Sequence, residues 1–313
     1  MFLFEPVPWY LILMWFVVVA VLVLVNEMAR RSKWFSLILF LVLPIVLTVA
    51  VWPKTVEENP EVGTWFNFVK VYSALLSVLD FLAMRFIKGL IANKSILMFP
   101  AIALAFNILL AVIVDFQVYH FDGEINGIMR ISGPWNIMNG IAGILNMITI
   151  SGWIGIFISN DKNKDLIWPD QMSFWIMAYT LWNFAFVYNC FSDHSFYSGA
   201  ALLISSLIPS FFIKRGAWLQ HRAQTLAIWM LFVMTYPAFV SDSIFAVQSS
   251  HSKTALWLIS SFSLVSSMAV LVYHLYKIIK YKRNPLEEEV YIDTAGYKKI
   301  IELYATATRK QKT

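Results

Sequence analysis

Titratable and hydroxyl side chains recur at helical spacing inside a segment that is otherwise apolar. Lys70, Ser73, Ser77 and Asp80 stand at positions i, i+3, i+7 and i+10, so they share one face of a helix. A charged side chain at the centre of a membrane helix costs about 2.5–3.5 kcal/mol on insertion scales. Lys70 and Asp80 are therefore expected to face protein or water. We interpret Lys70 as a group that holds an anion or pairs with an acid, and Asp80 as a proton or cation relay.

A second polar cluster lies in the stretch WNFAFVYNCFSDHSFYSG, residues 182–199. Asn183, Phe186, Asn189 or Cys190, and Asp193 are expected to share a helical face there, and Asp242 is expected at a similar depth in a later helix. Lys70 also lies within about two helical turns, roughly 10 Å, of the same membrane surface. We expect Asn189, Asp193 and Asp242 to border one outward-facing polar cavity, with Lys70 near its floor and an acid close to it. The candidate residues for binding a solute or an ion are Lys70, Asp80, Asn183, Asn189, Asp193 and Asp242.

Histidines on the same side raise the question of metal or nucleophilic chemistry. His and carboxylate side chains bind zinc tetrahedrally, and the candidates are His120, His194 and His251, with Asp115, Asp193 or Asp242. His194 also follows Cys190 by four residues, the spacing of a thiol–base pair. The sequence contains no HxH or HxxxH pair. We therefore predict no metal and no cofactor, and we favour a protein that is not an enzyme.

Composition indicates that these groups belong to a membrane protein. The chain is 59% hydrophobic and 14% charged, whereas soluble domains carry about a quarter charged residues. Apolar runs of about 20 residues, the length that crosses a bilayer, recur along most of it. We predict an all-α, polytopic transmembrane bundle with nine spans, at about 9–25, 34–51, 65–84, 96–114, 136–157, 171–190, 197–213, 225–246 and 254–276.

The positions of the basic residues predict the topology of that bundle. Of the 24 Lys and Arg residues, Lys70 lies within a span and only Lys54, Arg130 and Lys253 lie in one alternating set of loops. Short loops rich in Lys and Arg stay in the cytoplasm, so the amino terminus should be outside and the carboxyl terminus cytoplasmic. The net charge of +5 is then explained by the Lys and Arg residues of the cytoplasmic loops and tail. We expect membrane lipids and a small polar solute or ion as partners, and no nucleic acid.

The last part of the chain reads as a separate segment. Residues 1–284 form the predicted transmembrane domain, and residues 285–313 a cytoplasmic tail. Tyr297, Ile300, Ile301 and Tyr304 recur at i, i+3, i+4 and i+7, which predicts a short amphipathic helix on the membrane surface or against the bundle. In the outer loop 115–135, an Asp-Gly pair is the turn signal of a β-hairpin.

Two further polar stripes fall within predicted spans. The fifth span carries Asn136, Asn139, Gly140, Gly143 and Asn146, and the ninth carries Ser260, Ser263, Ser267 and His274. Small and amide residues let membrane helices approach and bond across an interface. Helix packing explains the Ser stripe, whereas the Asn stripe fits packing and a polar path equally well.

Four stretches also resemble a known family: NEMARRSKW (26–34), VWPKT (51–55), VGTWFNFVKVYSAL (62–75) and WNFAFVYNCFSDHSFYSG (182–199). They resemble a family of bacterial multi-pass inner-membrane proteins classed as a domain of unknown function. The resemblance implies a bacterial inner-membrane protein, and it brings no activity, ligand or catalytic residue.

The polar stripes favour a transport protein, or a receptor-like binder, for a small polar or charged solute. Transporters often break helices near such sites, and Pro44, Pro100, Pro209 and Pro237 offer breaks. Two alternatives stay open. One is a membrane-embedded, metal-assisted hydrolase with an outward-facing site that uses His120, His194, Asp193 and Asp242. The other is a non-catalytic scaffold in which the stripes only pack helices.

Overall fold

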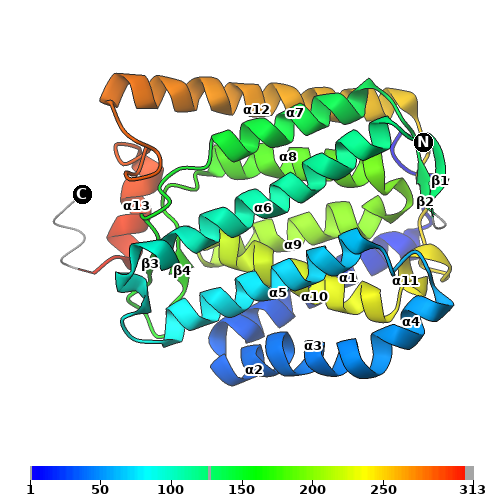
Figure 1. The fold of residues 1–313 in the computed structure, drawn as a ribbon, viewed down its shortest axis with the longest axis horizontal. Helices are drawn as coiled ribbons and strands as arrows, with labels where there is room; N and C mark the ends of the chain where they lie inside the picture. Colours follow the sequence, from blue (N-terminus) through cyan, green and yellow to red (C-terminus); the bar gives the residue numbers. More distant parts are fainter. Residues whose placement is uncertain (1, 126–127, 307–313) are drawn as a thin grey trace.

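The computed structural model describes residues 2–306 except 126 and 127, and these residues form a bundle of long helices (Figure 1). The helices are α1 (Trp9–Arg31), α2 (Lys33–Leu37), α3 (Leu43–Val46), α4 (Trp52–Glu58), α5 (Trp65–Phe86), α6 (Lys94–Tyr119), α7 (Pro134–Ile148), α8 (Ser173–Cys190), α9 (Leu202–Ile208), α10 (Trp218–Thr235), α11 (Ala238–Ser241), α12 (Lys253–Tyr281) and α13 (Ala295–Tyr304). Two short antiparallel hairpins join β1 (Gly123–Ile125) to β2 (Ile128–Arg130), and β3 (Phe157–Ile158) to β4 (Leu166–Ile167). The all-α prediction is confirmed.

The loops gather at two opposite ends of the bundle (Figure 1). One end carries the amino terminus, α4, the β1–β2 hairpin and α11, and we call it the amino-terminal end. The other carries the β3–β4 hairpin and α13, and we call it the tail end. Successive long helical segments run from one end to the other, so the loops alternate between the two ends.

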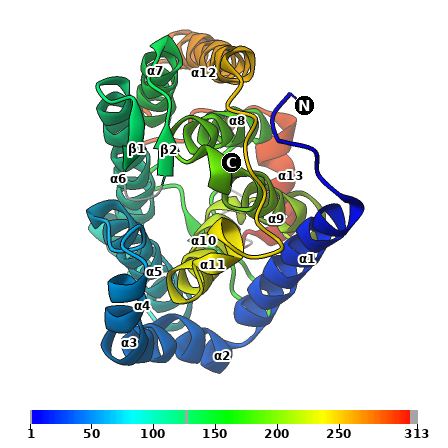
Figure 2. The same cartoon turned by 90° about the vertical axis from the view of Figure 1, so that its right-hand side faces the viewer.

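The helices form an outer ring around a central group (Figure 2). α12, α7, α6, α5, the α2–α4 segment and α1 lie around the outside, and α8, α9 and α10 lie within. Residues of the outer helices such as Trp9, Val49 and Ile279 are about three-quarters exposed, as expected for surfaces that face lipid. α8 and α10 are instead buried along most of their length.

Six helical segments are long and apolar enough to cross a membrane, judged by length and composition: Trp9–Arg31, Lys33–Glu58, Trp65–Phe86, Lys94–Tyr119, Ser192–Ile213 and Lys253–Tyr281. The 15-residue α7 and the central helices α8 and α10 are not among them. Because α8 and α10 are surrounded by protein, their sequences need not be uniformly apolar.

Prolines shape several of these segments. Pro44 lies between two π-helical turns, Ile38–Val42 and Leu47–Val51, and Pro209 begins a third, Pro209–Ile213. Proline removes one helical hydrogen bond, and a local π turn is one way to accommodate the loss. Pro237 separates α10 from α11, whereas Pro100 lies inside an unbroken α6.

Two predicted segments differ from the helices found. The segment predicted over 136–157 is helical only to Ile148, because the chain turns at Gly152, whose φ of 64° lies in the left-handed region. The segment predicted over 225–246 corresponds to α10, which begins earlier, at Trp218, and ends at Thr235. This earlier start places Arg222 inside a helix.

The outer hairpin and the tail helix both form. The Asp-Gly pair does not join the strands, because Gly123 pairs with Arg130 at the open end of the hairpin; the two residues between the strands, 126 and 127, lie outside the described residues. Tyr297, Ile300 and Ile301 of α13 are buried against the bundle, so the tail helix docks on protein. Residues 307–313 of the predicted tail also lie outside the described part of the chain.

The two polar stripes meet at helix interfaces. Asn139 Oδ1 accepts a hydrogen bond from Ser263 at 2.7 Å, and Asn146 Nδ2 donates to Ser267 at 3.2 Å. A Cβ at Gly143 would lie 2.5 Å from Val112 and 2.8 Å from the Trp182 indole, so the glycine allows α7 to approach its neighbours closely. These stripes pack α7 against α12, α6 and α8.

A buried carboxylate, Asp165, holds several elements together at the tail end. It accepts hydrogen bonds from Arg30 at 2.8 Å and from Gln220 at 3.0 Å, and Lys214 Nζ and Arg85 Nη2 lie 3.5 and 4.0 Å from it. The carboxylate is fully buried. It thereby joins α1, α5 and the start of α10 to the loop that precedes α8.

We expect Asp165→Asn to destabilise the fold strongly. The change leaves Arg30, Arg85 and Lys214 without their shared buried anion, and breaking a buried pair costs about 3–5 kcal/mol. The melting midpoint of the purified protein in detergent should fall by several degrees. The matched control is Glu58→Gln, which breaks the exposed Lys54–Glu58 pair and should leave the midpoint unchanged. Equal midpoints for both variants would contradict the role of Asp165.

Asp170 ties the tail to the loop before α8. Its carboxylate accepts hydrogen bonds from the backbone N–H groups of Val290 and Tyr291, at 2.9 and 2.8 Å, and from the Ser151 hydroxyl at 2.6 Å. Burial raises the pKa of Asp170 to about 6, although these hydrogen bonds favour the ionised form. A raised folded-state pKa stabilises the docked tail at low pH, and this contribution is lost as the pH rises through about 6.

We therefore expect α13 to dock more tightly at pH 5 than at pH 7, by about 1 kcal/mol. Hydrogen exchange of the α13 amides, corrected for the pH dependence of intrinsic exchange, measures this difference. Asp170→Asn cannot ionise and should remove it. A wild-type difference that persists in Asp170→Asn would assign the effect to another group.

Candidate functional site

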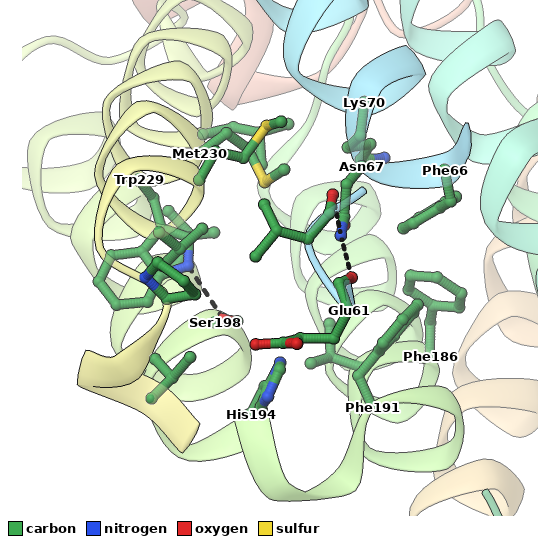
Figure 3. A pocket seen from close by; sticks show the side chains of 18 of the residues that line it. Glu61, Phe66, Asn67, Lys70, Phe186, Phe191, His194, Ser198, Trp229 and Met230 are labelled. Atoms are coloured by element: carbon green, nitrogen blue, oxygen red, sulfur yellow. Dashed lines mark hydrogen bonds between the residues drawn. The ribbon is translucent and has the colours of Figure 1, made fainter. Parts of the chain in front are cut away.

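A cavity of about 120 Å³ lies between α5, α8, α10 and the π-helical segment Ser195–Ala201 (η5), toward the amino-terminal end (Figure 3). Its rim includes the exposed Ser241, so it reaches the protein surface. Its polar lining residues are Glu61, Asn67, Lys70, Asn183, His194, Ser198, Arg222 and Ser241, and its apolar ones are mainly aromatic residues, leucine, valine and methionine.

Helical periodicity explains which residues face the cavity. α10 contributes Arg222, Leu226, Trp229, Met230 and Val233, which recur at i, i+4, i+7, i+8 and i+11. From α8 come Asn183, Phe186 and Val187, and from α5 come Phe66, Asn67 and Lys70. One face of each of the three helices therefore converges on the same space.

The deepest polar groups of this cavity are two buried cations. Lys70 is 7% exposed and Arg222 is 4% exposed. Lys70 Nζ donates to the backbone oxygen of Asn107 at 3.3 Å, and Arg222 Nη2 donates to Asn183 Oδ1 at 3.4 Å. Arg222 Nε and Nη1 are buried and make no hydrogen bond. Within the described residues, no carboxylate oxygen lies within 4.0 Å of either cation.

The network at the tail end sets the position of Arg222. Two residues before it, Gln220 bonds both Asp165 and the backbone N–H of Leu166, at 3.0 and 2.8 Å. One residue before it, His221 Nδ1 lies 2.9 Å from the Asn26 amide. These contacts anchor the first turn of α10, so the rotation of the helix, and with it the direction of Arg222, is determined by buried polar contacts.

A smaller cavity of about 30 Å³ begins where the first one ends. The two share Lys70, Arg222 and Leu226, and the smaller one continues past Ser77 and Phe81 toward the tail end. It is also lined by residues of α6, including Asn107. The cation pair thus lies at the junction of two cavities along the bundle axis.

Aromatic rings form one wall of the larger cavity (Figure 3). The rings of Phe66 and Phe191 are stacked, with centroids 5.5 Å apart, and Phe186 lies 5.9 Å from Phe66. On the opposite side, Trp229 Nε1 donates to Ser198 Oγ at 2.9 Å, which fixes the indole. At the mouth, the Glu61 side chain points toward His194.

The structure brings together only two of the six predicted site residues. Lys70 and Asn183 line the cavity. The prediction that Asn189, Asp193 and Asp242 border it is wrong. Asn189 lies about 120° around α8 from Asn183, and its amide donates to Ser260 at 2.9 Å.

The carboxylates of Asp193 and Asp242 both lie away from the cavity lining. Asp193 lies on the short 3₁₀ turn Ser192–His194, accepts from the Ser249 backbone N–H at 2.9 Å and lies 3.0 Å from His251 Nε2. Asp242 follows α11 and is exposed. The prediction of an acid beside Lys70 is therefore also wrong among the described residues.

The remaining acids within helices lie apart from the cavity. Asp80 is half-buried, its Oδ2 has no hydrogen-bond partner, and it does not line either cavity. Asp115 is fully buried, accepts from Asn139 Nδ2 at 2.8 Å and lies 3.4 Å from the Cys190 thiol.

The histidines do not assemble a metal or nucleophile site. His194 lines the cavity mouth, His251 contacts Asp193, and His120 caps the end of α6. In the part of the chain that the structure describes, no three His, Cys, Asp or Glu residues lie close enough to hold a metal ion. The predicted partners Cys190 and His194 point to different surroundings, since the Cys190 thiol faces Asp115.

The sequence interpretation missed Arg222 and Glu61. Arg222 was counted as a loop residue because α10 was expected to begin at 225, and Glu61 was placed in an outer loop. The segment Gln220–Thr225 is rich in polar residues, as loops are, although in the structure it is buried. A helix at the centre of a bundle can carry such residues because it does not need a uniformly apolar surface. The i, i+4, i+8 spacing of Arg222, Leu226 and Met230 was the available signal.

Comparison with curated proteins and with solved structures finds no match. One family model, described as "Family of unknown function (DUF5692)", matches residues 5–303. The match covers nearly the whole chain and agrees with the resemblance found in the sequence. The protein therefore belongs to this family of unknown function.

Proposed function

We propose that the chain is an integral membrane protein of nine spans that binds a small anionic solute in the larger cavity, as the substrate of transport. The amino-terminal end would face the outside and the tail end the cytoplasm. The six long apolar segments, the alternating loops and the Lys- and Arg-rich tail end support this arrangement.

One observation carries the proposal: Lys70 and Arg222 are buried where the two cavities meet, and among the described residues no carboxylate oxygen lies within 4.0 Å of either cation. A buried charge without a partner is costly. At the tail end, the same chain surrounds Asp165 with three cations. An anion between Lys70 and Arg222 would supply the missing charge and the acceptor that Arg222 lacks.

The second cavity favours transport over simple binding. The cation pair lies between a cavity that reaches the amino-terminal end and a smaller one directed toward the tail end. Transporters place their site near the middle of the membrane, with access from either side in turn. An anion that moved from this junction toward the tail end would pass Leu226, which lines both cavities, and Phe81, which lines the smaller one.

The topology predicts the behaviour of reporter fusions in cells. Fusions after residues 60, 125 and 250 should report an external location, and those after 90, 163 and 300 a cytoplasmic one. The reason is the bias of Lys and Arg toward the second set of loops. Two consecutive loops that report the same side would exclude nine spans.

Neutral substitutions of the cations should weaken anion binding. Lys70→Gln or Arg222→Gln removes a charge-assisted hydrogen bond worth about 1.5–3 kcal/mol, which corresponds to a loss of about 10- to 100-fold in affinity. Saturable stabilisation of the purified protein by sodium salts of chloride, phosphate, acetate and benzoate measures this loss.

The controls for this experiment are Lys253→Gln, which removes an exposed cation at the same end, and Arg222→Lys, which keeps the charge. Lys253→Gln should bind as wild type, and Arg222→Lys should retain part of the affinity. Binding that is unaffected by either neutral variant, or that is lost equally in Lys253→Gln, would refute the proposed site.

A further inference from the structure

We infer that the anion is an organic monoanion with a flat apolar body, about the size of benzoate, and not an inorganic ion; this inference rests on the proposed function of the same cavity. It follows from three features of the cavity: the composition of its walls, its size and the distribution of charge along it.

The walls between the floor and the mouth suit an apolar body. Phe66, Phe186 and Phe191 line one side, and Trp229, Met230 and Met234 the other. Aromatic pairs favour offset-stacked and edge-to-face contacts with ring centroids about 4.5–7 Å apart, and a flat ring offers both. An inorganic anion such as phosphate would leave this apolar surface unmatched, and it would lose more bound water than the few polar groups beyond Lys70 and Arg222 can replace.

The size of the cavity limits the ligand. An apolar cavity of about 150 Å³ in another protein binds benzene, so a space of about 120 Å³ is of the size that suits one six-membered ring. Benzoate, with a carboxylate and a six-membered ring, is of this size. A chloride ion would fill only a small part of the space.

The charges lie at opposite ends of the cavity. Lys70 and Arg222 form the floor, and the Arg222 guanidinium has two nitrogens without a hydrogen-bond partner, Nε and Nη1, either of which can donate to a carboxylate oxygen. Glu61 lies at the mouth beside His194 (Figure 3). A second negative charge at the outer end of the ligand would meet Glu61, so a monoanion fits better than a dianion.

The test measures the affinity of the purified full-length protein for benzoate, benzamide, cyclohexanecarboxylate and inorganic phosphate, by calorimetry in detergent. We expect benzoate to bind, benzamide at least tenfold more weakly because it lacks the charge, cyclohexanecarboxylate several-fold more weakly because it is not flat, and phosphate not measurably. Phosphate binding without benzoate binding would overturn the inference and leave the proposed anion site intact. Equal binding of benzamide and benzoate, or no binding of any anion, would overturn both.

A substitution in the cavity wall distinguishes the contribution of the ligand's apolar body to affinity from that of its charge. Phe186→Leu should weaken benzoate about 3- to 10-fold and leave acetate unchanged, because acetate reaches only the floor. The control is Phe212→Leu, on a side chain that is 85% exposed, which should change neither. If Phe186→Leu lowers the melting midpoint, Met230→Ala supplies a second test from the opposite wall of the cavity. Equal losses for benzoate and acetate in both wall variants would contradict the inference.

Discussion

A charge buried in an apolar bundle must be neutralised, and this constraint explains much of the structure. At the tail end, one fully buried carboxylate, Asp165, accepts hydrogen bonds from Arg30 and Gln220 and forms an ion pair with Lys214. These contacts join helices that are far apart in the sequence. At the cavity floor, Lys70 and Arg222 are also buried, and they lack such a partner among the described residues. Because the chain supplies partners for the buried charge of Asp165 but not for those of Lys70 and Arg222, we infer that a bound anion neutralises these two cations.

Helix α10 connects the tail-end network around Asp165 with the cavity. Its first turn carries the residues that bond the tail-end network, and its next residues line the cavity. The C-terminal helix α13 packs close to the same turn, where Ile300 lies against Gly216 and the Lys214 ammonium lies 3.9 Å from the Tyr304 ring centroid. Contacts at the tail end therefore help to orient Arg222 within the bundle. Central placement inside a ring of apolar helices keeps this polar helix away from lipid.

The sequence was sufficient to predict the helical class, the tail helix and two residues that line the cavity, Lys70 and Asn183, because period and hydropathy are local properties. It did not reveal where the chain turns after α8, so Asp193 was assigned to the cavity although it bonds Ser249. It also missed Arg222, since a polar first turn in a central helix looks like a loop. Which groups meet in the membrane plane depends on helix rotation, and tertiary contacts such as Gln220 with Asp165 set that rotation.

The central claim is that an anion lies between Lys70 and Arg222. An experimental structure of the full chain with 4-bromobenzoate, in which anomalous scattering locates the bromine, tests it most directly. The account predicts a carboxylate within hydrogen-bonding distance of Lys70 Nζ and the Arg222 guanidinium, with the bromine among Phe191, Trp229 and the mouth. A structure at saturating ligand with an empty cavity, and with Glu61 or Asp80 paired to these cations, would contradict it.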